Sequence, residues 1–427
     1  MRSINIGILG LGTVGCGTAE LLQRNAELIS RRVGADIRIA AVVDLDLERP
    51  RPVSFPPESM TTDAHRVITD PDIDIIVEVI GGVHPAREFI IEALQQGKNV
   101  VTANKELIAK HGSEILDVAG RYGRDFLFEA SVGGGIPIIG PLKSSLVANR
   151  IEKILGIVNG TTNYILTSMS SEGKDFADVL QEAQAMGYAE ADPTSDVDGY
   201  DSAYKLAILS AIAFNTRIKI DDIYCEGISG ISSKDIAYAA ELGYVIKLLA
   251  VARPFNGQVE ARVHPAMLPA DHPLASVNDV FNAVWLRGDG VGDLMFYGRG
   301  AGSLPTGSAI IGDVVESARN IINGASGRIS CTCFDKLDIR PISDISLKYY
   351  LRLQVADKPG VLASLAGVLG DHTVSISSVV QKSGGDMAEL VIITHEVEEK
   401  NVQAAIGVLR KMNYVSEVSS LIRLEEE

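Results

Sequence analysis

Short apolar runs alternate with amphipathic segments over the first 140 residues of the chain, and this order predicts an α/β domain with a parallel sheet. Two of the segments between the runs have the pattern of helices, at residues 17–29 and 85–96. The runs that we expect to be buried strands cover residues 4–9, 37–43, 73–80, 99–103 and 126–130.

From residue 141 the pattern changes to that of an α+β region, because strands and helices no longer alternate strictly. The expected strands cover residues 151–158, 223–228, 247–253 and 259–265. The expected helices begin at residue 164 and also cover residues 176–186 and 203–214. A glycine-rich loop at 298–302 precedes another predicted helix at 307–322, and we expect residues 303–330 to return to the first domain.

The C-terminal residues repeat a different order, strand–helix–strand–strand–helix–strand, which is typical of a ferredoxin-like domain. The strands are expected at 349–355, 374–381, 388–394 and 418–424, and the helices at 361–369 and 403–412. Residues 332–346 have the mixed composition of a linker. The chain is therefore expected to form three domains, at residues 1–140, 141–302 and 347–427.

Composition narrows the class of protein. With 427 residues, 46% hydrophobic and 22% charged, the chain is long enough for two or three folded cores. Its formal charge of -16 argues against a nucleic-acid surface and against binding to an anionic membrane. Four cysteines cannot form a disulfide framework, and the pair Cys331 and Cys333 has no partner pair for zinc. We expect free thiols in a cytoplasmic protein without a signal sequence or a membrane-spanning segment.

A glycine motif follows the first predicted strand directly. Residues 10–15 match G-x-G-x-x-G, and a helix pattern comes next. In a strand–turn–helix unit of this kind, the glycines let backbone N–H groups reach a pyrophosphate, so a Rossmann-type dinucleotide-binding domain is expected. The candidate cofactor-binding residues in this loop are Gly10, Gly12, Thr13, Val14 and Gly15.

Asp44 ends the second predicted strand, at the position of an acid that binds the ribose of the cofactor. A carboxylate there suits a 2′-hydroxyl and repels a 2′-phosphate. Arg49 and Arg51 follow closely and could bind that phosphate instead. The sequence leaves the choice between NAD and NADP open.

Two further candidates lie where later strands end, at the sheet edge where ligands bind in an open parallel sheet. Lys105 follows the strand at 99–103, where it could touch nicotinamide or substrate or could be a solvated lysine at a helix start. Glu129 precedes three consecutive glycines at 133–135. Such a loop can hold a hard cation through oxygen atoms, although by composition it is more often a flexible turn.

An acidic loop at residues 187–201 leads into an apolar, helix-like segment. Asp201 and Lys205 are four residues apart and would share one face of that helix. A lysine at the mouth of an apolar segment is a candidate proton donor, since desolvation lowers the pKa of an ammonium group towards neutrality. The alternative is an ordinary exposed ion pair of little energetic consequence.

Several separate segments together resemble homoserine dehydrogenase in the form that carries a C-terminal ACT regulatory domain. The resemblance covers nearly the whole chain, and residues 357–362 are similar to ACT domains. The segments that carry it are residues 10–15, 102–105, 156–164, 187–205 and 298–306.

This resemblance implies the reduction of L-aspartate 4-semialdehyde to L-homoserine by NADPH or NADH, in threonine, methionine and isoleucine biosynthesis. Lys205 matches the proton donor of the family, and Lys105 matches a lysine near nicotinamide and substrate. Val43 stands where many members have a basic residue, which argues against strict use of NADP. The other matching residues are Glu190 and Asp201 for the substrate, Gly187 and Gly302 for the cofactor, and Glu129, Val132, Gly134 and Ile136 for a monovalent cation, Na⁺ or K⁺.

The resemblance also implies a substrate-binding and dimerisation role for the middle domain, a homodimer or homotetramer, and feedback inhibition by an amino acid, with threonine expected, at the ACT domain. Two alternatives are weighed against this activity. A semialdehyde dehydrogenase that forms an acyl phosphate would need a nucleophilic cysteine, and Cys225 is the only candidate in the middle region. A noncatalytic amino-acid sensor could retain the cofactor fold, but the intact Lys105, Asp201 and Lys205 argue against it.

Overall fold

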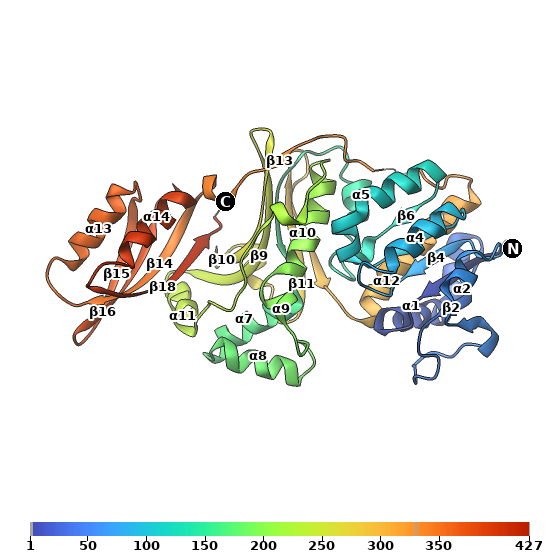
Figure 1. Ribbon diagram of the computed structural model, residues 1–427, viewed down its shortest axis with the longest axis horizontal. Helices are drawn as coiled ribbons and strands as arrows, with labels where there is room; N and C mark the ends of the chain where they lie inside the picture. Colours follow the sequence, from blue (N-terminus) through green and yellow to red (C-terminus); the bar gives the residue numbers. More distant parts are fainter. Residues whose placement is uncertain (1–2, 329–330, 427) are drawn as a thin grey trace. The chain divides into compact units, whose positions relative to one another are not determined.

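The computed structural model describes residues 3–328 and 331–426 (Figure 1). The limits of the expected domains at residues 1–2, 329–330 and 427 lie outside this part of the chain. The chain forms two compact units, each assembled from three segments. The first unit comprises Met1–Glu152, Tyr204–Ile220 and Asn282–Leu337, and the second comprises Lys153–Ala203, Asp221–Phe281 and Asp338–Glu427.

The first unit contains a six-stranded sheet with the order β3-β2-β1-β4-β5-β6, in which every pair is parallel. The strands are β1 (Ser3–Leu9), β2 (Asp36–Val43), β3 (Met60–Thr61), β4 (Ile75–Glu78), β5 (Asn99–Thr102) and β6 (Phe126–Leu127). The chain progresses outward from β1 in one direction and from β4 in the other, so the order reverses between these two strands. This reversal is the topological switch point of a doubly wound sheet, and the expected Rossmann-type fold is confirmed.

The helices of this unit include a late one that completes the core of the sheet. They are α1 (Thr13–Arg24), α2 (Ala26–Val33), α3 (Ala64–Ile68), α4 (Ala86–Gln95), α5 (Lys105–Tyr122), α6 (Ile139–Lys143), α12 (Ser303–Ile322) and most of α10 (Tyr200–Ala213), with 3₁₀ turns η1 (Pro57–Ser59) and η2 (Glu129–Ser131). Ile310, Val314 and Ala318 of α12 lie in one buried cluster with Ile6 and Ile8 of β1. The burial of this apolar surface is what holds a distant segment against the N-terminal sheet.

A close crossing joins α1 to α12. A Cβ atom at Gly17 would lie 2.2 Å from the carbonyl oxygen of Ser303, and one at Gly307 would lie 2.8 Å from the carbonyl carbon of Gly17. Only glycine permits this approach of two helix backbones. The hydroxyl of Ser303 donates to the carbonyl oxygen of Thr13 at 2.9 Å, so the first turns of α1 and α12 lie together.

Two predicted elements of this unit differ from the structure, and one hairpin was missed. The expected helix at 17–29 begins earlier, at Thr13, and is divided at Asn25, whose φ of −109° and ψ of 15° leave the helical region. The expected strand at 126–130 ends at Leu127, because the backbone N–H of Glu129 donates to the carboxylate of Asp313 and the chain turns into η2. A hairpin of β11 (Phe281–Gly288) and β12 (Gly292–Arg299) was not expected.

The second unit contains strands in the order β7-β9-β10-β18-β14-β16-β15. The strands are β7 (Ile151–Ile157), β9 (Tyr244–Phe255), β10 (Gln258–Pro269), β14 (Ser346–Ala356), β15 (Ile376–Gly384), β16 (Met387–Thr394) and β18 (Val415–Leu424), with short strands β8 (Tyr224–Cys225), β13 (Asp338–Ile339) and β17 (Val397–Glu398). The helices are α7 (Gly160–Glu172), α8 (Phe176–Ala185), α9 (Thr194–Val197), α11 (Ser233–Glu241), α13 (Val361–Asp371) and α14 (Glu399–Leu409), with 3₁₀ turns η3 (Ile220–Asp222), η4 (Pro273–Ser276) and η5 (Ile342–Asp344).

The predicted strands at 247–253 and 259–265 are the middle parts of one long hairpin. Asn256 and Gly257, which join β9 to β10, both have positive φ values, of 47° and 80°. This is the conformation of a type I′ turn, whose twist matches that of the flanking strands. The two strands pair from Phe255 and Gln258 over their whole length, beyond the bounds that the apolar pattern suggested.

The C-terminal segment has the expected ferredoxin-like order of strands and helices. Strand β14 pairs antiparallel with both β16 and β18, and α13 and α14 cover the same face of these strands (Figure 1). Leu365 of α13 and Ile406 of α14 share a buried cluster with Tyr349 and Leu351 of β14. The cluster closes a core for this segment, which matches the expected ACT domain.

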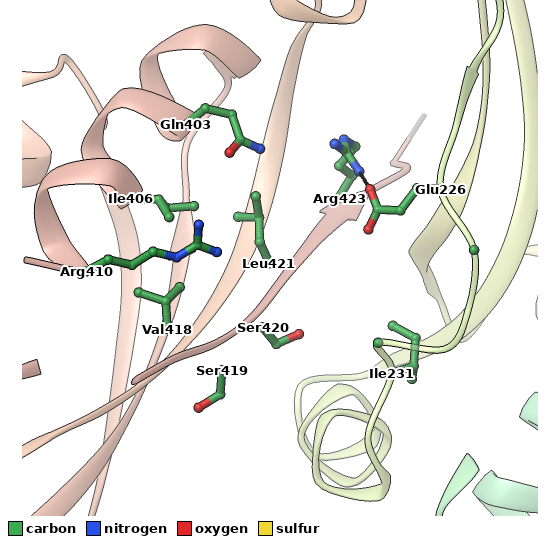
Figure 2. A pocket seen from close by; sticks show the side chains of 12 residues that line it. Glu226, Ile231, Gln403, Ile406, Arg410, Val418, Ser419, Ser420, Leu421 and Arg423 are labelled. Carbon is green, nitrogen blue, oxygen red and sulfur yellow. Dashed lines mark hydrogen bonds and ion pairs between the residues drawn. The ribbon is translucent and has the colours of Figure 1, made fainter. Parts of the chain in front are cut away.

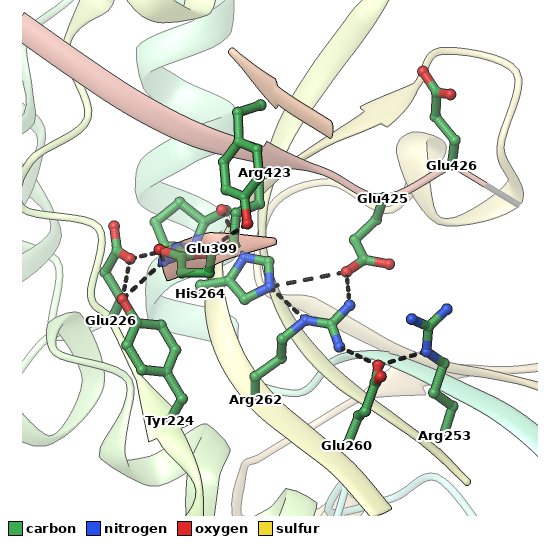
Figure 3. A network of polar contacts seen from close by, with 12 residues as sticks. Tyr224, Glu226, Arg253, Glu260, Arg262, His264, Glu399, Arg423, Glu425 and Glu426 are labelled. Atoms are coloured by element: carbon green, nitrogen blue, oxygen red, sulfur yellow. Dashed lines mark hydrogen bonds and ion pairs between the residues drawn. The ribbon is translucent and has the colours of Figure 1, made fainter. Parts of the chain in front are cut away.

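The ACT strands continue the sheet of the β9–β10 hairpin within the same unit. Strand β18 pairs parallel with β10, and a buried polar network lies at this junction (Figure 3). Arg262 forms ion pairs with Glu260 and Glu425, and its Nε donates to His264 at 3.1 Å. Burial lowers the pKa of His264 to about 3, so its imidazole is neutral and accepts this hydrogen bond. The buried charges are thus paired, as their desolvation requires.

Over the two described stretches of the chain, no helix combines the length and the apolar character needed to cross a membrane.

Candidate active site

The loop between β1 and α1 has the shape of a phosphate-binding turn. Gly10 has a φ of +100°, and a Cβ atom there would lie 2.7 Å from the carbonyl oxygen of Val79. A Cβ atom at Gly15 would lie 2.1 Å from the carbonyl oxygen of Gly10. Gly12 is exposed, and its position has open space around it. The first N–H groups of α1 have no acceptors within the helix, so the turn presents donors to an anion, with Thr13 and Val14 in the first turn.

Asp44 lies beside this loop and holds it. Its carboxylate accepts from the backbone N–H of Leu11 at 2.8 Å and pairs with Arg51 at 3.4 Å. Burial alone would raise the pKa of Asp44, but hydrogen bonds from the backbone of Asp46 and Leu11 and the charge of Arg51 outweigh it and lower the pKa below its ordinary value. The residue is therefore a carboxylate at neutral pH.

The guanidinium of Arg51 is already bound to neighbouring groups of the protein. Its guanidinium donates to backbone carbonyl oxygens of Leu11, Asp46 and Arg49 in addition to its pairing with Asp44. The side chain is 6% exposed. Most of its donors are thus used inside the protein, which leaves few for a 2′-phosphate.

A buried network sits where β4 and β5 end. Glu78 accepts from the hydroxyl of Thr102 at 2.6 Å and from the backbone N–H of Ile80 at 2.8 Å. Burial raises the pKa of Glu78, although these hydrogen bonds act in the opposite direction. The hydroxyl of Thr102 also accepts from the backbone N–H of Asn104 at 3.0 Å. The network therefore ties the two loops at this sheet edge to each other and fixes the chain just before Lys105.

Lys105 is the first residue of α5, and Asn104 caps that helix through a hydrogen bond from the backbone N–H of Leu107 at 3.1 Å. Further along α5, the ammonium of Lys110 lies 5.5 Å from the ring centroid of Tyr204. Tyr204 precedes Lys205, so the helices that carry the two candidate lysines are neighbours within the first unit.

Asp201 and Lys205 occupy the first two turns of α10, where they are only 3% and 8% exposed. A solvated ion pair would be more exposed, so that interpretation of the spacing is wrong. The amide of Asn159 donates to Asp201 at 2.9 Å and to Asp196 at 2.7 Å. The same side chain caps α7 by accepting from the backbone N–H of Thr162 at 2.8 Å. One asparagine therefore orients two carboxylates and begins a helix.

The remaining candidates lie on loops. Gly187 ends α8 with a φ of +75°, and Glu190 is exposed three residues later. The hydroxyl of Thr161 donates to the carbonyl oxygen of Tyr188 at 2.8 Å, which holds this loop to α7. Gly302 has a φ of +124° at the N-terminus of α12. It therefore lies in the first unit next to the turn that begins α1.

The candidate cation site contains a carboxylate that accepts three backbone hydrogen bonds. Glu129 accepts from the backbone N–H groups of Ile138, Ile139 and Gly140 at 2.6–2.8 Å. A carboxylate has about four lone-pair positions, so one remains. In the described part of the chain, no hydrogen bond to the carbonyl oxygens of the other three candidates is present. The carboxylate of Glu129 and the carbonyl oxygens of Val132, Gly134 and Ile136 thus keep the acceptor capacity that a hard cation would need.

The cysteines do not form a reactive site. Burial raises the pKa of the Cys225 thiol to about 11, and the thiol donates to the carbonyl oxygen of Asp198. A nucleophilic cysteine needs a lowered pKa, so this environment argues against acyl-phosphate chemistry. Burial also raises the pKa of Cys333, to about 12. Across residues 3–328 and 331–426, no group of three or more His, Cys, Asp or Glu side chains could hold a metal ion.

Sequence reasoning missed Asn159, Glu78 and Lys247 as parts of this framework. The ammonium of Lys247 donates to the side chains of Asn163 and Asn278 and to the carbonyl oxygen of Val277, and so ties α7 to a loop. Asn159 stands before a helix pattern, which is the sequence signal of a cap. Its second contact, with Asp201, carries no local signal because 42 residues separate the two.

Known families match the chain over most of its length. A family model described as homoserine dehydrogenase matches residues 137–315. One described as the NAD-binding domain of homoserine dehydrogenase matches residues 10–129, and the ACT domain matches residues 349–413.

Relatives of known function or structure match most or all of the chain. A homoserine dehydrogenase of Synechocystis sp. is 48% identical, with 99% of both chains covered. A crystal structure of a homoserine dehydrogenase from Thiobacillus denitrificans has a TM-score of 0.94 at 44% identity and covers 100% of this chain and 99% of that one. A hyperthermophilic archaeal homoserine dehydrogenase in complex with NADPH has a TM-score of 0.62 at 27% identity and covers 74% of this chain and 98% of that one.

The parallel sheet with its glycine turn, the buried acid and lysine on α10 and these matches define an oxidoreductase that binds a nicotinamide dinucleotide and carries a C-terminal ACT domain. The chain belongs to the homoserine dehydrogenase family. The expected fold class and enzyme activity are confirmed. The alternative of a noncatalytic amino-acid sensor finds no support in these matches.

Proposed function

We propose that Lys205 and Asp201 carry the reduction of L-aspartate 4-semialdehyde to L-homoserine. The observation that supports this assignment most strongly is the burial of both side chains one turn apart on α10. Burying two opposite charges costs free energy, and such an arrangement is most often retained at functional sites.

The bound cofactor supplies a hydride to the aldehyde carbon. The aldehyde oxygen then needs a proton, which the ammonium of Lys205 donates while its charge stabilises the developing alkoxide. Asp201, held by Asn159, binds the ammonium of the substrate through a charge-assisted hydrogen bond. Glu190 is the second substrate-binding carboxylate, on the loop after α8. Lys105 contacts substrate and nicotinamide from the end of β5.

We propose that the enzyme accepts NADH at least as well as NADPH. Asp44 is a carboxylate at the position that receives a ribose 2′-hydroxyl, and Arg51 is already bound to Asp44 and to backbone carbonyl oxygens. The backbone N–H groups of residues 12–15 hold the pyrophosphate. Gly187 and Gly302 supply further cofactor contacts.

We also propose that Na⁺ or K⁺ binds through Glu129 and the carbonyl oxygens of Val132, Gly134 and Ile136. The three donors already on Glu129 make this loop well ordered without an ion, so the cation tunes the loop and is not needed for folding. Replacing the monovalent salt with choline chloride should lower the activity and leave the thermal midpoint nearly unchanged.

The ACT domain is expected to bind an amino-acid effector, with threonine as the first candidate. Assembly into a homodimer or homotetramer is supported by β12, an edge strand with Met295 and Tyr297 exposed by 41% and 53%. Exposed apolar side chains on an unpaired edge are costly in a monomer.

The test is a direct assay of the purified full chain with L-aspartate 4-semialdehyde and either NADH or NADPH. We expect cofactor oxidation that depends on the semialdehyde, with a specificity constant for NADH equal to or above that for NADPH. Binding of a dinucleotide without oxidation would contradict the assigned chemistry. Oxidation of NADPH alone would contradict the role of Asp44 but not that of Lys205.

A further inference from the structure

A few polar side-chain atoms are buried without a hydrogen-bond partner among the described residues. They belong to Arg124, Ser210, Asn282, Ser317 and Ser419. Buried polar groups are normally paired, so each of these atoms needs a physical explanation. Ser419 has one, because it lines a cavity of about 260 Å³ with Glu226 and Arg410, and this cavity has room for water (Figure 2). Asn282 stands apart from the others, because both the oxygen and the nitrogen of its amide are unpartnered.

The amide of Asn282 lies against the backbone of Gly300 within the first unit. Asn282 is the second residue of β11 and is only 1% exposed. A Cβ atom at Gly300 would lie 1.9 Å from Nδ2 of Asn282, 2.1 Å from its Cγ and 2.7 Å from its Oδ1. The whole amide group therefore faces the Cα atom of Gly300, and only glycine leaves room for it there.

The backbone groups of Gly300 are unpaired as well. Gly300 is buried, and in the described part of the chain neither its N–H nor its carbonyl group takes part in a hydrogen bond. A side-chain amide and a peptide group have complementary donors and acceptors. Here they lie next to each other, but the amide meets the Cα atom and no bond forms. Unpaired polar groups in the interior cost free energy, so a rotation of the peptide groups that paired them would be favourable.

The loop that contains Gly300 ends at the phosphate-binding turn. Gly302 closes this loop with a φ of +124°, and the hydroxyl of Ser303 after it donates to the carbonyl oxygen of Thr13 at 2.9 Å. A dinucleotide held by the first turn of α1 would therefore touch the loop. The three glycines at positions 298, 300 and 302 give its backbone the freedom to adjust.

The backbone before Asn282 is fixed, so the loop is the part that can move. The carbonyl oxygen of Phe281 accepts from the side-chain amide of Asn163 at 3.0 Å. The same amide donates to the carbonyl oxygen of Val277, and the ammonium of Lys247 donates to that oxygen as well. Asn282 thus begins β11 from a segment that is tied to α7 and β9.

We propose that Asn282 is a positioning residue for the cofactor, which acts through the loop at residues 298–302. When the dinucleotide binds, the peptide groups around Gly300 turn and pair with the amide of Asn282. The unpaired amide raises the free energy of the unliganded arrangement, so the residue favours the loop conformation that holds the cofactor. This inference rests on the proposed binding of the dinucleotide at residues 12–15, and not on the proposed roles of Asp201 and Lys205.

The test compares the affinity for the dinucleotide with the stability of the unliganded full chain. Asn282→Leu replaces the amide with an apolar group of similar shape. Titration calorimetry with NADH and with NADPH measures affinity without turnover, and thermal unfolding measures stability. Ser317→Ala is the matched control, because it removes another buried, unpartnered polar group that lies about 20 Å along α12 from Ser303.

Asn282→Leu should bind both dinucleotides about tenfold more weakly than the wild type, as expected for the loss of one or two hydrogen bonds. Its thermal midpoint without cofactor should equal or exceed that of the wild type, because no unpaired amide remains in the interior. Ser317→Ala should likewise be at least as stable as the wild type, but it should bind both dinucleotides with unchanged affinity.

Unchanged affinity in Asn282→Leu would overturn the proposal. Weaker binding together with a lower midpoint would overturn it as well, since that pattern belongs to a residue that only supports the fold. If the leucine protein does not fold, Asn282→Ala replaces it in the calorimetry, and an affinity equal to that of the wild type again overturns the proposal.

Steady-state kinetics separate this proposal from the proposed activity. In Asn282→Leu the KM for NADH should rise about tenfold, whereas kcat at saturating NADH and the KM for the semialdehyde should stay close to those of the wild type. Weaker binding of NADH to Asn282→Leu, with no dehydrogenase activity in either protein, would support the role of Asn282 and contradict the activity. Dehydrogenase activity with the same KM for NADH in both proteins would support the activity and overturn the role of Asn282.

Discussion

The amide nitrogen of Asn159 donates a hydrogen bond of 2.9 Å to the carboxylate of Asp201, which is only 3% exposed. The same amide contacts Asp196 at 2.7 Å. A neutral amide donor shared by two carboxylates orients both of them, which suits the proposed contact between Asp201 and the substrate ammonium. The helix cap at α7 and the proposed substrate anchor are therefore parts of one structure.

Replacing Asn159 with alanine should raise the KM for the semialdehyde about tenfold or more, because Asp201 loses the group that orients it. The lost cap should also lower the free energy of unfolding by about 1 kcal/mol. Steady-state kinetics and urea unfolding of the same preparation measure the two effects. Asp63→Ala removes another helix cap, at α3, and serves as the control for stability alone. An unchanged KM in Asn159→Ala would contradict the orienting role.

Replacing Lys205 with alanine should lower kcat by about 100-fold or more, the range found when a general acid is lost. Lys205→Arg should not restore the rate, since a guanidinium keeps the charge but does not give up its proton. Stopped-flow or steady-state oxidation of the cofactor measures kcat. Lys219→Ala, at an exposed position, should behave as the wild type. A kcat in Lys205→Ala close to that of the wild type would rule out the assignment.

Replacing Asp44 with serine should reduce the specificity constant for NADH about tenfold and should reduce that for NADPH less. In its proposed role, the carboxylate accepts a hydrogen bond from the ribose hydroxyl of NADH and repels the 2′-phosphate of NADPH, so its loss should cost NADH more than NADPH. The ratio of the two specificity constants is the measurement, because it cancels any general damage to the loop after Leu11. A ratio that does not change would show that Asp44 acts only on the loop.

Protonation of Glu425 should lower the stability of the enzyme at acid pH. Burial alone raises its pKa, but the ion pairs with Arg262 and Lys153 outweigh burial and lower the pKa to about 2. A folded-state pKa below the unfolded value of 4.5 contributes stability above pH 4.5, and this is lost as the pH falls towards 2. The contribution is about 3 kcal/mol.

Urea unfolding at several pH values between 5 and about 3 tests this expectation. The free energy of unfolding should fall less steeply with decreasing pH in Glu425→Gln than in the wild type. The difference in slope should reach at most about 1.4 kcal/mol per pH unit, which corresponds to one proton taken up on unfolding. Glu417→Gln, at an exposed position, should keep the full slope. Equal slopes in Glu425→Gln and the wild type would show that this carboxyl is not stabilised in its charged form.

Two glycines on α12 should respond oppositely to alanine. A Cβ atom at Gly307 would lie 2.8 Å from the backbone of Gly17, whereas the position of Gly312 is open. Gly307→Ala should therefore lower the free energy of unfolding by more than 1 kcal/mol or so. Gly312→Ala should raise it by up to about 1 kcal/mol, because alanine has the higher helix propensity. Thermal unfolding compares them, and a Gly307→Ala protein as stable as Gly312→Ala would contradict the close crossing of α1 and α12.

The order of helices and strands was predictable wherever one hydrophobic pattern continued over a whole element. Apolar runs with a period of two or with full burial identified β1, β2 and β5, and the glycines between β1 and α1 predicted the dinucleotide turn with its place in the fold. The Asn-Gly pair at residues 256–257 is a similar local signal, because both positions have a positive φ, although this turn was not among the predicted elements. These features depend on residues that are neighbours in the chain, so the sequence was sufficient for them.

The hairpin of β11 and β12 escaped prediction because β12 is half exposed and mixes glycine with aromatic residues. The division of the first helix at Asn25 was missed as well. Neither feature is marked by a strong period of hydrophobic residues along the sequence. Their conformations depend on packing partners that are far away along the chain, and propensity is a weak guide under those conditions.

By itself, the sequence determined which residue types the enzyme offers as candidates for its chemistry: a glycine turn suited to phosphates, an acid suited to ribose, and an acid and a lysine one helical turn apart. Only the tertiary structure decided that this acid and lysine are buried, that Asn159 orients Asp201 across 42 residues, and that Arg410, Glu226 and Ser419 line one cavity. The physical reason is that local patterns encode conformation, whereas burial and the partners of a charge depend on the whole fold.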